Sequence, residues 1–194
     1  MLVLLHGRGS DENDLLGLVP YLDPHFLVAS VRAPRPFNSG GFTWCDLEHV
    51  GLPNNAQIVE SHARLIATLD ELQEHHPVDP GRVFVLGFSM GAMMAFTLAL
   101  THPQRVRGIV AHSGYLPDVP LLAYQWHSLA ATAFFVAHGR FDPVVPVDFA
   151  RRSWQRLTDV HADLTYHEYP VTHTICDESL HDLTAWLSVR AAQG

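Results

Sequence analysis

The sequence has little cysteine and no long apolar segment. Its 194 residues include only two cysteines, Cys45 and Cys176, which are too few for a framework of disulfide bonds. No apolar run reaches the roughly 18 residues that a membrane-spanning helix needs. The first ten residues also lack the basic start of a signal peptide. These absences predict a cytoplasmic protein without integral membrane association.

Basic residues are scarce as well. The chain has 12 of them against 20 acidic residues, for a net charge of −8, which argues against nucleic acids and anionic membrane surfaces as partners. Internal repeats, low-complexity segments and marked shifts of composition are also absent. We therefore expect a single domain over residues 1–194, large enough to bury about 70% of the surface of the unfolded chain. A homodimer is compatible with this composition.

Short strand-like runs alternate with helix-like runs along the whole chain. Strands are predicted at 2–5, 26–31, 82–88, 106–112, 132–138 and 162–169. Helices are predicted at 12–19, 56–76, 90–102, 147–158 and 177–192. The first five strand runs are almost continuously apolar, which is typical of parallel strands covered on both faces. The alternation predicts a three-layer α/β fold with a mostly parallel sheet of about six strands.

Four of the predicted strands end in glycine-rich or reactive residues, and ligands of such folds bind beyond the carboxyl ends of the strands. A glycine-rich turn at 6–9 follows the first strand, and Ser89 follows the third, inside the G-x-S-x-G pattern of residues 87–91. Asp142 follows the fifth strand and His173 the sixth. A serine hydroxyl becomes a nucleophile when an imidazole takes its proton and a carboxylate fixes the tautomer of that imidazole. The order serine, aspartate, histidine is that of α/β-hydrolases, so these residues are the predicted catalytic triad.

Two backbone amides are predicted to bind the oxyanion that forms when such a serine attacks a carbonyl. They belong to Met90, just past the serine, and to Arg8, in the glycine-rich turn. Gly7 and Gly9 would permit the backbone excursion that aims the Arg8 amide. The Arg8 side chain has two interpretations, an exposed turn residue or a cation that attracts an anionic group of the substrate.

Other residues compete for two of the three triad positions. Asp142 precedes a proline and could simply form a turn, in which case Asp118 or Asp148 would be the alternative acid. His167 and His181 compete with His173, but they lie inside a predicted strand and a predicted helix. Both are therefore interpreted as structural or surface residues.

Three further histidines, His6, His112 and His138, end strands near the same edge of the sheet. His6 and His138 are expected to position the turns that follow them. His112 is interpreted as structural, although a place in the pocket is open. His173, Cys176, Asp177 and His181 could be interpreted as zinc ligands, but their spacing matches no common zinc site. We therefore predict no metal site from these residues.

The segments HGRGSDENDL, GGFTWCD, GFSMGA and HGRFDPVVP together resemble the phospholipase/carboxylesterase branch of the α/β-hydrolases, which also contains the acyl-protein thioesterases. The resemblance implies an esterase with Ser89 as nucleophile, Asp142 as acid and His173 as base, and with no metal or organic cofactor. Many relatives have glutamine where this chain has Met90. They also usually begin with one or two more strands, so we expect a minimal six-stranded sheet or a truncated start.

Two long irregular segments, 33–55 and 113–129, are candidates for a functional role. Only these two segments could wall an apolar groove of the kind that a long acyl chain needs. The resemblance favours Phe42 and Trp44 as residues of the pocket wall. Val144, just beyond the predicted acid, is the third residue expected in the pocket. The predicted function is a serine carboxylesterase acting on small carboxylic esters. The same machinery would serve an acyl thioesterase or a lysophospholipase. From a different class of protein, a catalytically silent hydrolase fold that binds a small molecule or a partner is the remaining alternative.

Overall fold

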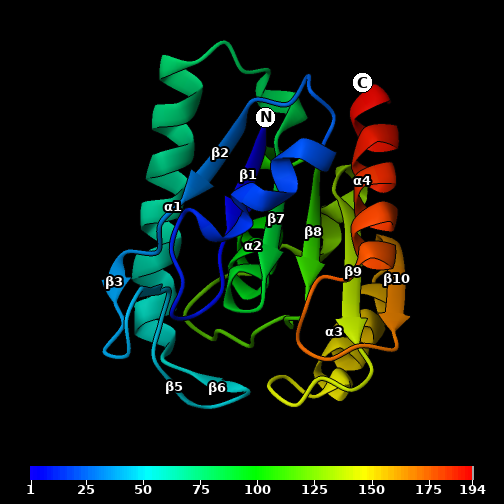
Figure 1. Cartoon of the computed structure of the whole chain (residues 1–194). Coiled ribbons are helices and arrows are strands. Elements are labelled where there is room, and N and C mark those ends of the chain that lie inside the picture. Colours follow the sequence, from blue (N-terminus) through cyan, green and yellow to red (C-terminus); the bar gives the residue numbers. More distant parts are fainter. Residues whose placement is uncertain (194) are drawn as a thin grey trace.

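The structure, a computed structural model, describes residues 1–193. Six strands form one parallel sheet in the order β10-β9-β8-β7-β1-β2 (Figure 1). They are β1 (Leu2–Leu5), β2 (Val28–Val31), β7 (Phe84–Phe88), β8 (Gly108–His112), β9 (Ala133–Gly139) and β10 (Asp163–Tyr169). The predicted α/β architecture with a parallel sheet of about six strands is confirmed, and the sheet begins at the second residue of the chain.

Helices cover both faces of this sheet (Figure 1). One face carries α1 (Asn55–His75), α2 (Met90–Thr101) and α3 (Val147–Asp159). The other carries the 3₁₀ helix η1 (Asp14–Tyr21) and α4 (Asp177–Ala192). In β1, Val3 and Leu5 join the first core and Leu2 and Leu4 join the second, because successive side chains of a strand point to opposite faces. This two-sided burial is the reason the inner strands are apolar at nearly every position.

Two segments differ from the simple helix-and-loop pattern that the sequence predicts. The helix expected at 12–19 is the 3₁₀ helix η1, which contains Gly17 and Pro20, two residues that disfavour an α-helix. The irregular segment 33–55 contains two short antiparallel pairs. These are β3 (Arg35–Pro36) with β4 (Phe42–Thr43), and β5 (Leu47–His49) with β6 (Leu52–Pro53). The remaining short helices are η2 (Pro80–Arg82), η3 (Pro103–Arg105) and η4 (Trp126–Ala131).

The chain changes its direction of growth across the sheet between β1 and β7. β2 adds to one side of β1, whereas β7 adds to the other side and the later strands extend outward to β10. A crevice forms at such a switch point, because the connections leaving the two neighbouring strands run to opposite faces. The glycine-rich turn after β1 and Ser89 after β7 both lie at this point. In Figure 1 the carboxyl ends of the strands point downward, toward the β5–β6 hairpin.

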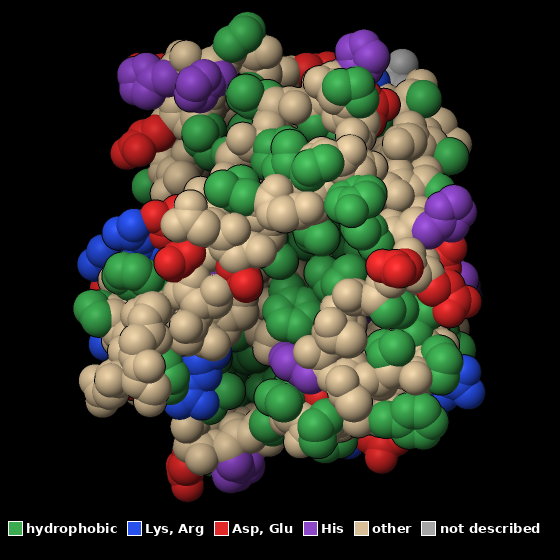
Figure 2. All heavy atoms as spheres, viewed as in Figure 1, with side chains coloured by type: hydrophobic (Ala, Val, Ile, Leu, Met, Phe, Trp, Pro, Cys, Tyr) green, Lys and Arg blue, Asp and Glu red, His purple; other side chains and the backbone are tan. Residues whose placement is uncertain are grey.

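The face of the molecule seen in Figure 2 is partly apolar. Hydrophobic side chains gather between η1 and α4, where the second core reaches the surface. Phe26, Phe88 and Trp186 are among the partly buried side chains that pack against this core. None of the helices in residues 1–193 combines the length and the apolar character that crossing a membrane requires.

Candidate active site

Ser89 occupies a sharp turn between β7 and α2. Its φ of 54° and ψ of −114° lie outside the ordinary regions for a residue with a side chain, and the surrounding contacts hold it there. The Ser89 N–H donates to the carbonyl of His112 over 2.8 Å. A Cβ added to Gly91 would lie 1.9 Å from the carbonyl oxygen of Leu5, and one added to Gly87 would lie 2.2 Å from that of Gly91. The two glycines therefore flank the serine because helix and strand backbones meet too closely for any side chain.

Three predicted side chains lie in one hydrogen-bonded row. Ser89 Oγ is 3.0 Å from His173 Nε2, and His173 Nδ1 is 2.6 Å from Asp142 Oδ2. His173 belongs to the loop after β10, and its ring packs against Phe88 with a centroid separation of 5.0 Å. In this row the imidazole of His173 can accept the serine proton at Nε2. The carboxylate of Asp142 fixes the tautomer in which Nδ1 carries the proton of the neutral ring.

The Asp142 carboxylate is fully buried and held on all sides. Its Oδ1 accepts the backbone N–H groups of Val144 and Val145, each over 2.8 Å. His138 lies 3.2 Å from Asp142 Oδ2 and donates through Nε2 to the Val145 carbonyl over 2.7 Å. Burial lowers the pKa of His138, with the Val145 carbonyl and Asp142 acting in the opposite direction. His138 thus contacts the turn that follows its strand, in agreement with the sequence prediction.

The amides expected to bind an oxyanion are available. Among residues 1–193, no carbonyl or side chain accepts a hydrogen bond from the backbone N–H of Arg8 or of Met90. Met90 is the first residue of α2, so its amide belongs to the positive end of the helix dipole. Gly9 has a φ of +80° and donates to the carbonyl of Phe42, which turns the chain sharply just past Arg8.

Two more histidines of the strand ends have structural partners. His6 Nδ1 donates to the Gly7 carbonyl over 2.7 Å and Nε2 accepts the N–H of Ala33 over 3.0 Å, so the ring fixes the turn that follows β1. His112 is fully buried between the hydroxyls of Ser113 and Ser179. Burial, followed by the nearby His138 and His173, lowers the pKa of His112 to about 3.

The alternative acids and bases lie away from the row. Asp118 is exposed, and Asp148 is exposed and pairs with Arg151. His167 packs beside the ring of Tyr169 on β10, and His181 is exposed on α4. In the part of the chain that the structure describes, none of the four is hydrogen-bonded to the serine or to the buried aspartate.

A cavity of about 310 Å³ opens over Ser89 and His173. Its apolar wall consists of Leu47, Val50, Phe88, Met90, Met93, Tyr115, Val144 and Val145, and its polar lining includes Arg8, Ser10 and Asp14. The Gly51 N–H donates to the Tyr115 hydroxyl over 3.0 Å, which ties the β5–β6 hairpin to segment 113–129. Residues of both segments line the cavity.

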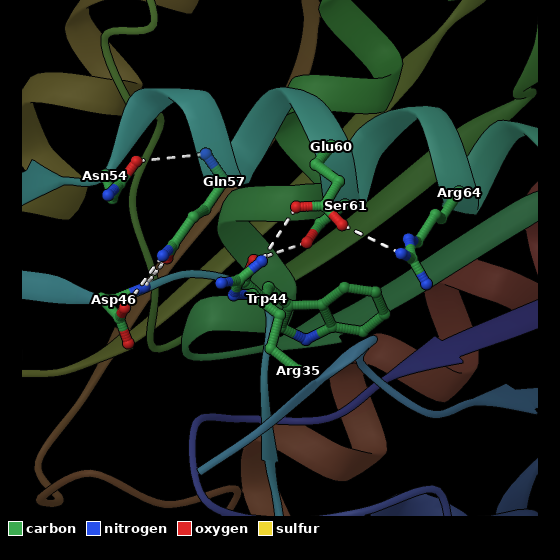
Figure 3. Close-up of polar contacts among 8 residues, drawn as sticks. All are labelled: Arg35, Trp44, Asp46, Asn54, Gln57, Glu60, Ser61 and Arg64. Carbon is green, nitrogen blue, oxygen red and sulfur yellow. Dashed lines mark hydrogen bonds and ion pairs between the residues drawn. The ribbon is translucent and has the colours of Figure 1, made fainter.

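The individual wall residues differ from the prediction. Val144 lines the cavity, but Phe42 and Trp44 do not. Trp44 is 1% exposed and donates through Nε1 to the His6 carbonyl over 2.9 Å, while its own carbonyl accepts from Ser61 of α1 (Figure 3). The Phe42 ring lies beneath the guanidinium of Arg32. Both aromatic residues belong to the packing that holds the segment onto the sheet and α1, rather than to the cavity.

The side chains of the possible zinc site do not meet at one point. His173 is bonded to Asp142, Cys176 caps the start of α4, and His181 lies on the exposed face of that helix. Within residues 1–193, no group of three or more histidine, cysteine, aspartate or glutamate side chains is placed to hold a metal ion.

The combination of a parallel sheet, a strained strand–serine–helix elbow and acid and histidine residues at later strand ends defines the class of α/β-hydrolases. Residues 1–190 match the model of the Phospholipase/Carboxylesterase family. The chain belongs to this family and is a serine hydrolase of the esterase type.

Several relatives resemble the chain over most of its length. The putative hydrolase MhqD of Bacillus subtilis is 26% identical over 186 residues, which cover 96% of this chain and 91% of that protein. Acyl-protein thioesterase 1 of Mycosarcoma maydis is 29% identical over 148 residues, covering 66% of this chain and 62% of that protein. The crystal structure of the Bacillus cereus carboxylesterase superposes with a TM-score of 0.88 at 25% identity, covering 98% of this chain and 88% of that one.

Proposed function

We propose that the protein is a serine carboxylesterase that hydrolyses small carboxylic esters through an acyl-enzyme on Ser89. The observation that carries this proposal is the row from Ser89 through His173 to the buried Asp142, at the floor of a cavity with an apolar wall. The proposal also includes a cytoplasmic location, a small-molecule substrate and no nucleic-acid partner, on the composition and charge of the chain.

In the first half of the reaction, Ser89 Oγ attacks the carbonyl carbon of the ester while its proton passes to His173 Nε2. Asp142 holds the other imidazole nitrogen and stabilises the imidazolium that forms. The N–H groups of Arg8 and Met90 bind the oxyanion of the tetrahedral intermediate. His173 then gives the proton to the leaving alcohol, and the acyl group remains on the serine.

In the second half, a water molecule gives a proton to His173 and attacks the acyl carbonyl. The same amides bind the second oxyanion, and collapse of the intermediate returns the proton to Ser89 Oγ and releases the carboxylic acid. Both halves use the same groups, so no metal or organic cofactor is required.

The size of the cavity predicts a preference for shorter acyl chains. At about 310 Å³ it lies at the small end of ligand pockets, and its wall is mainly apolar. For p-nitrophenyl esters from C2 to C12, kcat/KM is expected to rise by about fourfold for each methylene that the wall buries, and to fall once the chain exceeds the cavity. An optimum at C12 would contradict the small-ester preference but would leave the esterase reaction intact.

An acyl thioesterase or lysophospholipase is the second candidate, supported by the apolar wall and by the acyl-protein thioesterase relatives. Matched oxygen esters and thioesters of the preferred chain length separate the two, because the acyl-enzyme is identical and only the leaving group differs. A thioester kcat/KM more than tenfold higher would favour the acyl thioesterase.

Labelling tests the remaining alternative, a silent binding domain. A fluorophosphonate is expected to add to Ser89, as read by mass spectrometry of the modified peptide, because it reacts with activated serines. Absence of labelling together with absence of turnover on every ester and thioester would overturn the proposed function.

A further inference from the structure

A polar groove of about 580 Å³ adjoins the active-site cavity, and Arg8 and Leu47 line both. The other residues of the groove come from segment 33–55 and from α1. They are Pro34, Arg35, Pro36, Phe37, Asn38, Asp46, Glu60 and Arg64. A substrate group that extends from the ester bond past Arg8 and Leu47 therefore enters a space lined by charged and polar side chains, unlike the apolar wall of the cavity.

Three of the five charged side chains that line the groove form one ion-paired cluster (Figure 3). Glu60 lies between Arg35 and Arg64 and pairs with both, at 2.9 and 3.0 Å. Asp46 accepts the Gln57 side-chain amide over 2.9 Å. Arg8 has no such partner, since no carboxylate of residues 1–193 lies within 4.0 Å of its guanidinium. Three arginines therefore face two carboxylates, and the surplus cation is the one that borders the active site.

The Arg8 side chain is also held in place. Its guanidinium lies over the ring of Phe37, 4.6 Å from the centroid. Phe37 lines the groove and is not part of the cavity wall, so the cation lies at the end of the groove next to the cavity. A positive group held against an aromatic face, on a protein of net charge −8, offers local attraction to an anion.

We propose that the groove binds the leaving group of the substrate and that Arg8 recognises a carboxylate or phosphate on it. The proposal rests on the proposed esterase function, with the acyl part in the apolar cavity. In the lining of the cavity Arg8 is balanced by Asp14, whereas the groove has three arginines against two carboxylates, so the groove is the better place for the anion. The substrate class is then an ester of an alcohol or phenol that carries a negative charge.

The test compares two acetyl esters that differ in one group. 4-Acetoxybenzoate carries a carboxylate and 4-acetoxybenzamide a neutral amide of similar shape, and both give the same acetyl-enzyme. In the wild-type enzyme the ratio of kcat/KM for the anionic over the neutral ester is expected to exceed one. Arg8→Gln should lower this ratio roughly 5- to 10-fold, an effect between that of an exposed ion pair and that of a charge-assisted hydrogen bond. 4-Acetoxyphenyl phosphate, measured beside them, identifies by the larger ratio whether phosphate or carboxylate is preferred.

Two variants serve as controls. Arg32 also lies 4.6 Å over a phenylalanine ring, that of Phe42, but its charge is paired with Glu12 and it does not line the groove. Arg32→Gln is therefore expected to leave the ratio unchanged, although it removes the same charge from the protein. Arg8→Lys keeps the cation and should retain most of the preference, which a purely structural role of the guanidinium would not predict.

The outcomes separate this inference from the proposed function. If the neutral ester is hydrolysed and the ratio is the same in wild type and Arg8→Gln, the anion-binding role is wrong and the esterase is unaffected. A ratio below one in the wild type would also overturn it. If neither ester is hydrolysed, nor any other, the proposed function itself fails. A drop in the ratio with rising salt, seen in the wild type and lost in Arg8→Gln, would support the role of charge.

Discussion

Replacing Ser89 by alanine is expected to lower kcat for ester hydrolysis by about 10⁴- to 10⁶-fold, which removes measurable turnover in an ordinary assay. The hydroxyl is the atom that becomes acylated, and the structure describes no other hydroxyl next to a histidine that is itself bonded to a buried carboxylate. The measurement is hydrolysis of a p-nitrophenyl ester of short chain length by the purified variant, at concentrations high enough to detect one part in 10⁵.

A second serine of the same cavity provides the matched control. Ser10 lines the cavity, and among residues 1–193 no histidine is hydrogen-bonded to its hydroxyl, so Ser10→Ala should retain turnover. Because the groups act as a unit, the double variant Ser89→Ala/His173→Ala is expected to be no worse than Ser89→Ala alone. Equal turnover in wild type and Ser89→Ala would show that the hydroxyl is not the nucleophile.

The sheet was predictable from sequence because each buried strand appears as a short, continuous run of apolar residues. β1, β7, β8 and β9 are buried on both faces, so nearly every position before the strand ends is apolar and the runs stand out against the polar connections. The strand ends were equally informative. In a parallel sheet the carboxyl ends share one edge, and residues far apart in the chain, such as Ser89 and His173, therefore meet.

The wall of the cavity was predictable as segments but not as residues. Leu47 and Val50 reach the cavity because hydrogen bonds to other segments hold the β5–β6 hairpin in place. The Gln57 side chain of α1 is hydrogen-bonded to Asp46, and the Tyr115 hydroxyl accepts the N–H of Gly51. Such contacts leave no periodic trace in the sequence. An aromatic residue in an irregular segment indicates burial, but it does not indicate whether the covering surface is the core or a pocket. Trp44 is buried in the core.

The chain has 14 histidines, a high number that the structure explains in part. Within residues 1–193, four histidines are buried, and each has a hydrogen-bond partner. Two of them carry large pKa shifts. His62 donates through Nε2 to the Thr101 hydroxyl over 2.7 Å at the contact between α1 and α2, and burial, followed by the nearby His102, lowers its pKa to about 4. His112 is lowered to a pKa of about 3, mainly by burial.

These shifts predict that the folded protein loses stability in mild acid. Above pH 6.5 both histidines are neutral in the folded and the unfolded chain, so the stability is fully present. As pH falls below 6.5, both histidines become protonated in the unfolded chain. In the folded chain they stay neutral until the pH reaches their lowered pKa values, about 4 for His62 and about 3 for His112. Each histidine therefore costs about 2 kcal/mol at pH 5, and the two together about 4 kcal/mol.

A loss of that size is a large part of the stability of an ordinary domain, typically about 5–15 kcal/mol. The measurement is urea unfolding at pH 7 and pH 5, a range above that in which paired carboxylates such as Glu12 begin to bind protons. His62→Gln keeps a donor for Thr101 but cannot be protonated, so it should remove about half of the difference between the two pH values. His127→Gln, at an exposed position, should leave the difference intact.

A free energy of unfolding that changes by less than about 1 kcal/mol between pH 7 and pH 5 in the wild type would mean that the buried histidines accept protons without cost. Their neutral state would then play no part in holding α1, α2 and the end of β8 in place.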